Sequence, residues 1–334
     1  MLKEASFYEK LDNNTVRCFL CRHSCTILLH RKGLCGVREN REGKLYTLVY
    51  ARPVASNADP IEKKPLYHFL PGTYSYSIAT KGCNFKCSFC QNWQISQADE
   101  AQFLRGSHEL QPQLVVKKAL SAECKSIAYT YTEPTIFFEY AYDTAVLAKE
   151  KGLANVFVTN GYMERAPLKS IKPYLDAANV DLKSFNEDFY VKECAGRLKP
   201  VLENIRLMKD LGIWVEITTL IIPGSNDSPD EIENLAAFIA DVDPGIPWHI
   251  SRFHPDYKNN RRQSTPVAIL NKAKEIGEAA GLKYIYIGNI AGDNSTYCPG
   301  CGNKVIERSY FGINSTNLKG KKCSFCSEEI PGVF

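Results

Sequence analysis

The spacing of hydrophobic positions along the chain changes near residue 74. From there to about residue 290, short apolar runs alternate with longer amphipathic stretches. The runs are rich in β-branched and aromatic residues and are mostly followed by turn residues, as expected of strands buried on both faces of a parallel sheet. Seven runs have this character: YSYSIAT (74–80), SIAYTYT (126–132), NVFVTN (155–160), ANVDLK (178–183), WVEITTLII (214–222), WHISRF (248–253) and YIYIG (284–288).

Helical patterns lie between these runs. PTIFFEYAYDTAVLAKEKG ends at Gly152, whereas SPDEIENLAAFIADV starts with Ser228 as the expected N-cap and Pro229 at the first helical position. The alternation of strands and helices predicts repeated right-handed βαβ units, arranged either as a barrel or as an open parallel sheet.

The segments before and after this alternating region are rich in cysteine. Eleven of the thirteen cysteines fall into three groups, and only Cys124 and Cys194 stand alone, where we expect small buried apolar side chains. The N-terminus is polar and lacks an apolar signal segment, so we expect a cytoplasmic protein whose clustered thiols bind metal or act as redox centres. No run of eighteen apolar residues occurs, so we expect no membrane association.

These patterns divide the chain into three predicted parts. Residues 1–72 form an N-terminal cysteine-rich module and linker, residues 73–292 form the α/β core, and residues 293–334 form a C-terminal zinc-ribbon-like module. The 41 basic and 37 acidic side chains leave a net charge of only +4, which makes nucleic acid an unlikely partner.

The central cysteine group is Cys83, Cys87 and Cys90, in the loop GCNFKCSFCQNW after the first core strand. Iron–sulfur clusters are normally held by four thiolates, so three thiolates on a [4Fe–4S] cluster leave one iron open to an exogenous ligand. The alternative is a zinc knuckle that borrows His68 or His108.

This spacing, with Phe89 before the last cysteine, resembles the cluster motif of radical S-adenosylmethionine (SAM) enzymes. NVFVTNG, VDLKSF, TLIIPG and SRFH resemble the strand ends of glycyl-radical activating enzymes such as the pyruvate formate-lyase activase. DPIEKKPLYHFLPG, GCNFKCSFCQNWQIS, YTEPT and the cysteine-bearing tail resemble the AmmeMemoRadiSam type. The resemblance implies a partial (β/α)6 barrel in which SAM binds the open iron. It also implies reductive cleavage to a 5′-deoxyadenosyl radical, a one-electron donor such as ferredoxin or flavodoxin, and hydrogen abstraction from a partner protein or another substrate.

Candidate SAM contacts lie where the predicted strands end, because ligands gather at the carboxyl edge of such folds. Glu133 matches the acidic position of the family's glycine-rich element, and its alternative role is to cap a helix. Asp181 and Lys183 alternate on one strand and share a face, so they contact a ligand or form an internal ion pair. The full set of candidates is Glu133, Asn160, Asp181, Lys183, Thr218 and His254.

The two outer groups are expected to bind metal. Cys298, Cys301, Cys323 and Cys326 have zinc-ribbon spacing, which favours zinc over an auxiliary cluster. The N-terminal set leaves two alternatives open: structural zinc, slightly favoured, with His23 as an alternate ligand, or a second iron–sulfur cluster for electron relay. That set is Cys18, Cys21, Cys25 and Cys35.

Two other functions compete with activase-like chemistry. Radical chemistry could act on RNA or a cofactor precursor, with the small basic cluster Lys319, Lys321 and Lys322 in the tail. The chain could also be a non-catalytic metal or iron–sulfur scaffold, which would not cleave SAM.

Overall fold

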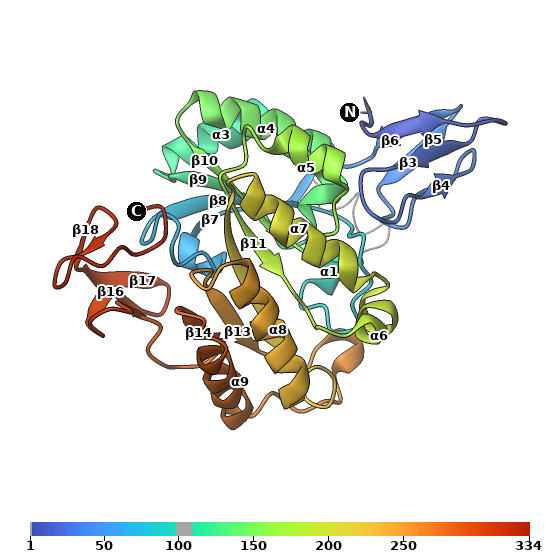
Figure 1. Cartoon of the computed structure of the whole chain (residues 1–334). Coiled ribbons are helices and arrows are strands. Elements are labelled where there is room, and N and C mark those ends of the chain that lie inside the picture. The colour runs from blue at the N-terminus through green and yellow to red at the C-terminus, as the bar shows by residue number, and fades with distance from the viewer. Residues whose placement is uncertain (1, 98–108) are drawn as a thin grey trace.

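The computed structural model describes residues 2–97 and 109–334 (Figure 1). Its centre is one sheet with strand order β14-β13-β12-β11-β10-β9-β8-β7, in which β8 to β14 are parallel and β7 is antiparallel to β8. All seven predicted runs are confirmed as strands. The strands are β7 (Pro53–Pro60), β8 (Tyr74–Thr80), β9 (Ser126–Tyr129), β10 (Ala154–Thr159), β11 (Ala177–Asp181), β12 (Trp214–Ile221), β13 (Trp248–Arg252) and β14 (Ile285–Gly288).

The helices between the strands cover the outside of this sheet (Figure 1). The predicted start of α8 is confirmed, because Ser228 accepts a hydrogen bond from the Glu231 N–H and Pro229 is the first helical residue. Gly152 follows the end of α4 at Glu150 and has a φ of 73°, a conformation that favours glycine. The helices are α1 (Trp93–Ser96), α3 (Pro112–Ser121), η2 (Pro134–Phe137), α4 (Phe138–Glu150), α5 (Arg165–Ile171), α6 (Glu187–Phe189), the π-helical turn η3 (Tyr190–Cys194), α7 (Leu198–Asp210), α8 (Pro229–Val242), η4 (Tyr257–Asn259) and α9 (Val267–Ala279), with the short η1 (Ile61–Lys63) after β7.

The N-terminal residues form two small three-stranded sheets. Strand β7 follows them and pairs with β8 over its whole length, although the sequence analysis assigned this segment to the linker. Its sequence, PVASNADP, has no apolar alternation, which is why the strand was missed. The domain boundary at residue 72 stays a prediction. The small strands are β1 (Lys3–Glu4), β2 (Tyr8–Lys10), β3 (Val16–Cys18), β4 (Thr26–Ile27), β5 (Arg38–Arg41) and β6 (Lys44–Thr47).

The C-terminal residues form a module on the side of the core opposite the N-terminal strands (Figure 1). Buried His68 joins the module to the core: its Nδ1 lies 2.7 Å from the Pro331 carbonyl and its Nε2 lies 2.7 Å from the Tyr286 hydroxyl. Because a carbonyl can only accept, Nδ1 carries the proton and Nε2 accepts from the tyrosine. The strands are β15 (Thr296–Tyr297), β16 (Lys304–Ser309), β17 (Gly312–Thr316), β18 (Leu318–Lys319) and β19 (Lys322–Cys323).

Candidate functional site

The central cysteine loop leaves the end of β8 and is held by main-chain hydrogen bonds. Gly82 starts it with a φ of 96°, which a side chain would strain. The Lys86 N–H donates to the Cys194 carbonyl at 2.8 Å, and the Ser88 N–H donates to the Glu193 carbonyl at 2.9 Å. Both acceptors belong to η3, so this turn fixes the shape of the loop.

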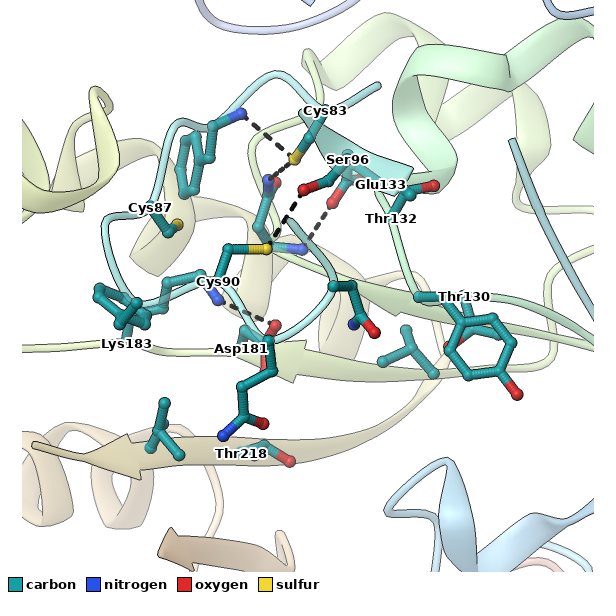
Figure 2. A pocket seen from close by; sticks show the side chains of 18 of the residues that line it. Cys83, Cys87, Cys90, Ser96, Thr130, Thr132, Glu133, Asp181, Lys183 and Thr218 are labelled. Atoms are coloured by element: carbon teal, nitrogen blue, oxygen red, sulfur yellow. Dashed lines mark hydrogen bonds and ion pairs between the residues drawn. The ribbon is translucent and has the colours of Figure 1, made fainter. Parts of the chain in front are cut away.

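Cys83, Cys87 and Cys90 line one cavity at the carboxyl ends of the parallel strands. Its empty space is about 1230 Å³, counting the opening to solvent. Figure 2 shows the cysteines, Glu133, Asp181 and Thr218 on different sides of this space. The structure thus brings together five of the six candidate SAM contacts, namely Glu133, Asn160, Asp181, Lys183 and Thr218.

His254 is not placed with them. It is exposed and is not among the described residues that line the cavity. The strand before it, β13, ends at Arg252 and contributes Ser251 to the lining instead. A role for His254 in SAM binding stays a prediction without structural support.

The spacing of the three sulfurs differs from that of a mononuclear site. A tetrahedral zinc ion with Zn–S bonds of about 2.3 Å places its sulfurs about 3.8 Å apart. Within residues 2–97 and 109–334, only the tail cysteines form a group of three or more ligand atoms within 4.8 Å of one another. The sulfurs of Cys83, Cys87 and Cys90 are therefore more widely spread than around one ion.

The surrounding groups fit a bound cluster with its ligand. The side-chain nitrogens of Asn84 and Gln91 are buried without a hydrogen-bond partner, and Gln91 lines the cavity. Such N–H groups need an acceptor, which cluster sulfur or a bound cofactor would supply. The zinc-knuckle alternative is weakened, because both ring nitrogens of His68 are engaged elsewhere. His108 lies outside the described residues.

Cys194, which stands outside the three cysteine groups, lies next to Cys87 of this loop. Hydrogen bonding to the Cys194 thiol, together with burial, raises the pKa of Cys87 well above its ordinary value. Cys194 is completely buried and does not line the cavity. It therefore lies behind Cys87 rather than across the cavity from it, and the position for a fourth ligand remains open.

Glu133 is a fully buried carboxylate at the N-terminus of η2. Its Oε1 accepts from the Thr135 N–H at 3.0 Å and from the hydroxyls of Thr135 and Thr159 at 2.6 and 2.8 Å. Its Oε2 accepts only from the Asn160 N–H, at 2.8 Å. Burial raises the pKa of Glu133, and these hydrogen bonds offset only part of that effect. Helix capping and ligand binding are thus compatible, because Oε2 keeps room for another donor.

Asp181 and Lys183 form the ion pair considered as an alternative to ligand binding. Lys183 Nζ lies 3.0 Å from Asp181 Oδ2 (Figure 2). Burial alone would lower the pKa of Lys183, but the adjacent Asp181 carboxylate outweighs this effect and raises that pKa. Because the pair also lines the cavity, it places a fixed ammonium beside the cysteines.

Two polar residues near the cysteines, Ser96 and Asn84, were not among the sequence-based candidates, and Ser96 lines the cavity. Ser96 in α1 lies 3.2 Å from the Cys90 sulfur, and Asn160 Nδ2 donates to Asn84 Oδ1 at 2.8 Å. Asn84 could have been suspected from its position next to Cys83. Ser96 could not, because only the backward turn of the loop brings α1 to Cys90.

The four tail cysteines form a compact group that could hold a metal ion. The sulfurs of Cys298 and Cys326 are 3.5 Å apart, and those of Cys301 and Cys323 are 3.8 Å apart. These separations agree with the roughly 3.8 Å of a tetrahedral zinc–thiolate site. Zinc itself stays a prediction.

The four N-terminal cysteines line a different cavity, together with His23 and Arg38. In contrast to the tail, no three of their sulfurs lie within 4.8 Å of one another. All thirteen cysteines lie in the described chain, and none forms a disulfide there.

Comparison with known proteins agrees with this geometry. A family model described as the Radical SAM superfamily matches residues 77–239. An uncharacterized protein of Methanocaldococcus jannaschii is 46% identical over 340 residues, which cover 100% of both chains. A putative glycyl-radical enzyme activating enzyme of the same organism is 30% identical over 218 residues, 63% of this chain and 77% of that protein. The chain belongs to the radical SAM superfamily. Membership implies SAM and a [4Fe–4S] cluster as cofactors and supports the prediction of an enzyme.

A solved structure supports the same fold. The radical SAM methyltransferase from Sphaerobacter thermophilus superposes with a TM-score of 0.50 at 18% identity, over 66% of this chain and 67% of that one. The predicted radical SAM fold is confirmed, with β7 added at one edge of the sheet. None of the described helices has the length and apolar character needed to cross a membrane.

Proposed function

We propose that this protein cleaves SAM reductively and uses the resulting radical to abstract hydrogen from a partner protein or another substrate, in the manner of glycyl-radical activating enzymes. The observation that carries the proposal is the arrangement of Cys83, Cys87 and Cys90 around a large cavity that no further cysteine lines in the described chain. A bound [4Fe–4S] cluster would supply the electron that splits the sulfonium of SAM.

The protein's own groups would bind and orient the cofactor. Glu133 is a buried carboxylate without a cationic partner in the described chain, so a cationic ligand would offset the cost of its burial. The ammonium of SAM is such a ligand and can donate to Glu133 Oε2. The Lys183 ammonium lies on another side of the same cavity, where it can contact an acceptor group of SAM. The Thr218 hydroxyl also lines the cavity and donates to Asn179 Oδ1, so it can accept a hydrogen bond from a donor group of SAM.

Further parts of the proposal depend on resemblance and residue type. We assign the protein to the AmmeMemoRadiSam type on its motifs, zinc to the tail cysteines on their spacing, and a ferredoxin- or flavodoxin-type protein as electron donor. Oxygen-sensitive thiolate clusters favour a reducing, cytoplasmic location. RNA or a cofactor precursor is the alternative substrate class.

The proposal is tested by anaerobic reconstitution with iron and sulfide, followed by incubation with dithionite and SAM and chromatography for 5′-deoxyadenosine. We expect product from the wild type and none from Cys87→Ala. Cys124→Ala is the matched control, because this buried cysteine lies outside all three groups. Product that survives Cys87→Ala, or a wild type that never forms product, would refute the proposal.

A further inference from the structure

We propose that Cys18, Cys21, Cys25 and Cys35 hold a second iron–sulfur cluster, placed beside the catalytic loop so that electrons enter through it. The four cysteines surround an empty space of about 350 Å³, counting its opening to solvent. The assignment of this metal site is independent of the proposed SAM cleavage, whereas its role in electron entry rests on that function.

The first argument is the spacing of the sulfurs. No three of the four sulfurs lie within 4.8 Å of one another, although the tail cysteines of the same chain do. A single zinc ion holds its thiolates about 3.8 Å apart, a separation that the tail pairs match and that no three of the N-terminal sulfurs share. The wider arrangement suits a cubane, whose thiolates bind different iron atoms at its corners.

The second argument is a buried guanidinium group, two nitrogens of which have no hydrogen-bond acceptor. Arg38 is 1% exposed and lines this cavity. Its Nη2 donates to Glu139 and to the Ser6 carbonyl, but its Nε and Nη1 are buried without an acceptor. A thiolate-ligated cluster offers sulfur acceptors, so it would satisfy the N–H groups at Nε and Nη1 that the ion pair with Glu139 leaves free.

The third argument is the character of the remaining wall. Leu20, Ile27, Leu34 and Ile136 are apolar, and they line the cavity between the cysteines. An apolar wall limits access of water to a bound cluster, and the solvent exposure of a cluster is one of the factors that set its reduction potential. The site is therefore suited to a redox role.

The position of the site connects it with the catalytic loop. A Cβ atom built on Gly82 would lie 2.8 Å from the Cys35 carbonyl oxygen, and Gly82 directly precedes Cys83. His23 Nε2 lies 2.8 Å from the Asn84 carbonyl, to which it donates because a carbonyl only accepts. The main chains of the two cysteine groups are thus in van der Waals contact. One electron from a ferredoxin- or flavodoxin-type donor could pass across this contact, with no bond made or broken.

The metal assignment is tested in a Cys83→Ala/Cys87→Ala/Cys90→Ala variant, which removes the catalytic ligands. After anaerobic reconstitution we expect about four irons and about four sulfides per chain, with a low-temperature electron paramagnetic resonance signal after reduction. Iron near zero with zinc in both outer groups would overturn the assignment. Because three substitutions in one loop can destabilise the fold, Cys18→Ser/Cys25→Ser in the otherwise wild-type chain provides a second test, and it should lower the iron from about eight to about four per chain. Cys124→Ser is the control, and circular dichroism monitors folding.

The electron-entry role is tested in the Cys18→Ser/Cys25→Ser variant with two reductants. We expect 5′-deoxyadenosine formation with a flavodoxin-type donor to fall at least about tenfold, while dithionite, a small reductant, still supports it. Equal rates with the protein donor would overturn this role. If no chain forms 5′-deoxyadenosine but the catalytic-cysteine variant keeps its iron, the proposed function fails and the second cluster stands.

Discussion

Replacement of Glu133 by glutamine tests whether this side chain binds the ammonium of SAM in addition to capping η2. Oε1 already accepts three hydrogen bonds and Oε2 accepts one, so a ligand ammonium would add a single charge-assisted hydrogen bond at Oε2. Such a bond contributes about 1.5–3 kcal/mol, which corresponds to roughly 10- to 100-fold weaker SAM binding when it is lost. The amide nitrogen of Glu133→Gln would also meet at least one N–H donor, which costs about 1–3 kcal/mol of folding free energy.

The assay is equilibrium binding of SAM to the anaerobically reconstituted protein, with iron content and thermal unfolding measured in parallel. Glu216→Gln is the matched control. Glu216 is also a fully buried carboxylate and accepts four hydrogen bonds, but it does not line the cavity. We expect both variants to be destabilised and only Glu133→Gln to bind SAM weakly. Folded, iron-loaded Glu133→Gln that binds SAM within about twofold of the wild type would refute the reasoning.

Three further outcomes are expected. Cys194→Ala should keep the iron of the catalytic loop, whereas Cys87→Ala should lose it. Iron content and visible absorbance measure this difference. Loss of iron in Cys194→Ala would make Cys194 a fourth ligand. His68 is fully buried, and burial lowers its pKa to about 4 from its ordinary value of 6.5. The neutral imidazole therefore makes its full contribution to the free energy of unfolding above pH 6.5, and this contribution is lost as the pH falls through 4. This pKa shift corresponds to about 3 kcal/mol of folding free energy. When the free energy of unfolding is measured with denaturant from pH 7 to pH 4, it should depend less on pH in His68→Gln than in the wild type. An unchanged dependence on pH would contradict the prediction. Cys323→Ser should lower the zinc content by about one ion per chain and leave the iron content unchanged. An unchanged zinc content would contradict a zinc site at the tail.

The sequence alone determined the α/β core and the three candidate cluster cysteines. Strands buried on both faces are rich in apolar, β-branched and aromatic residues, so the seven runs were recognisable without any knowledge of their neighbours. The ligands of the catalytic loop lie within eight residues, and their spacing is a local property of the chain. Candidate contacts such as Glu133 and Asp181 could be predicted because the carboxyl ends of parallel strands meet at one edge.

Only the tertiary structure decided features that depend on contacts between distant segments. Strand β7 has no apolar alternation and is defined by its pairing with β8. Cys194 lies behind Cys87, and Gly82 lies against Cys35, because separate elements fold onto one loop. The spacing of a motif indicates which thiols are close to one another in the sequence. The distances between their sulfurs depend on how the surrounding elements pack. That is why the same residue type forms a compact group in the tail and a spread one at the N-terminus.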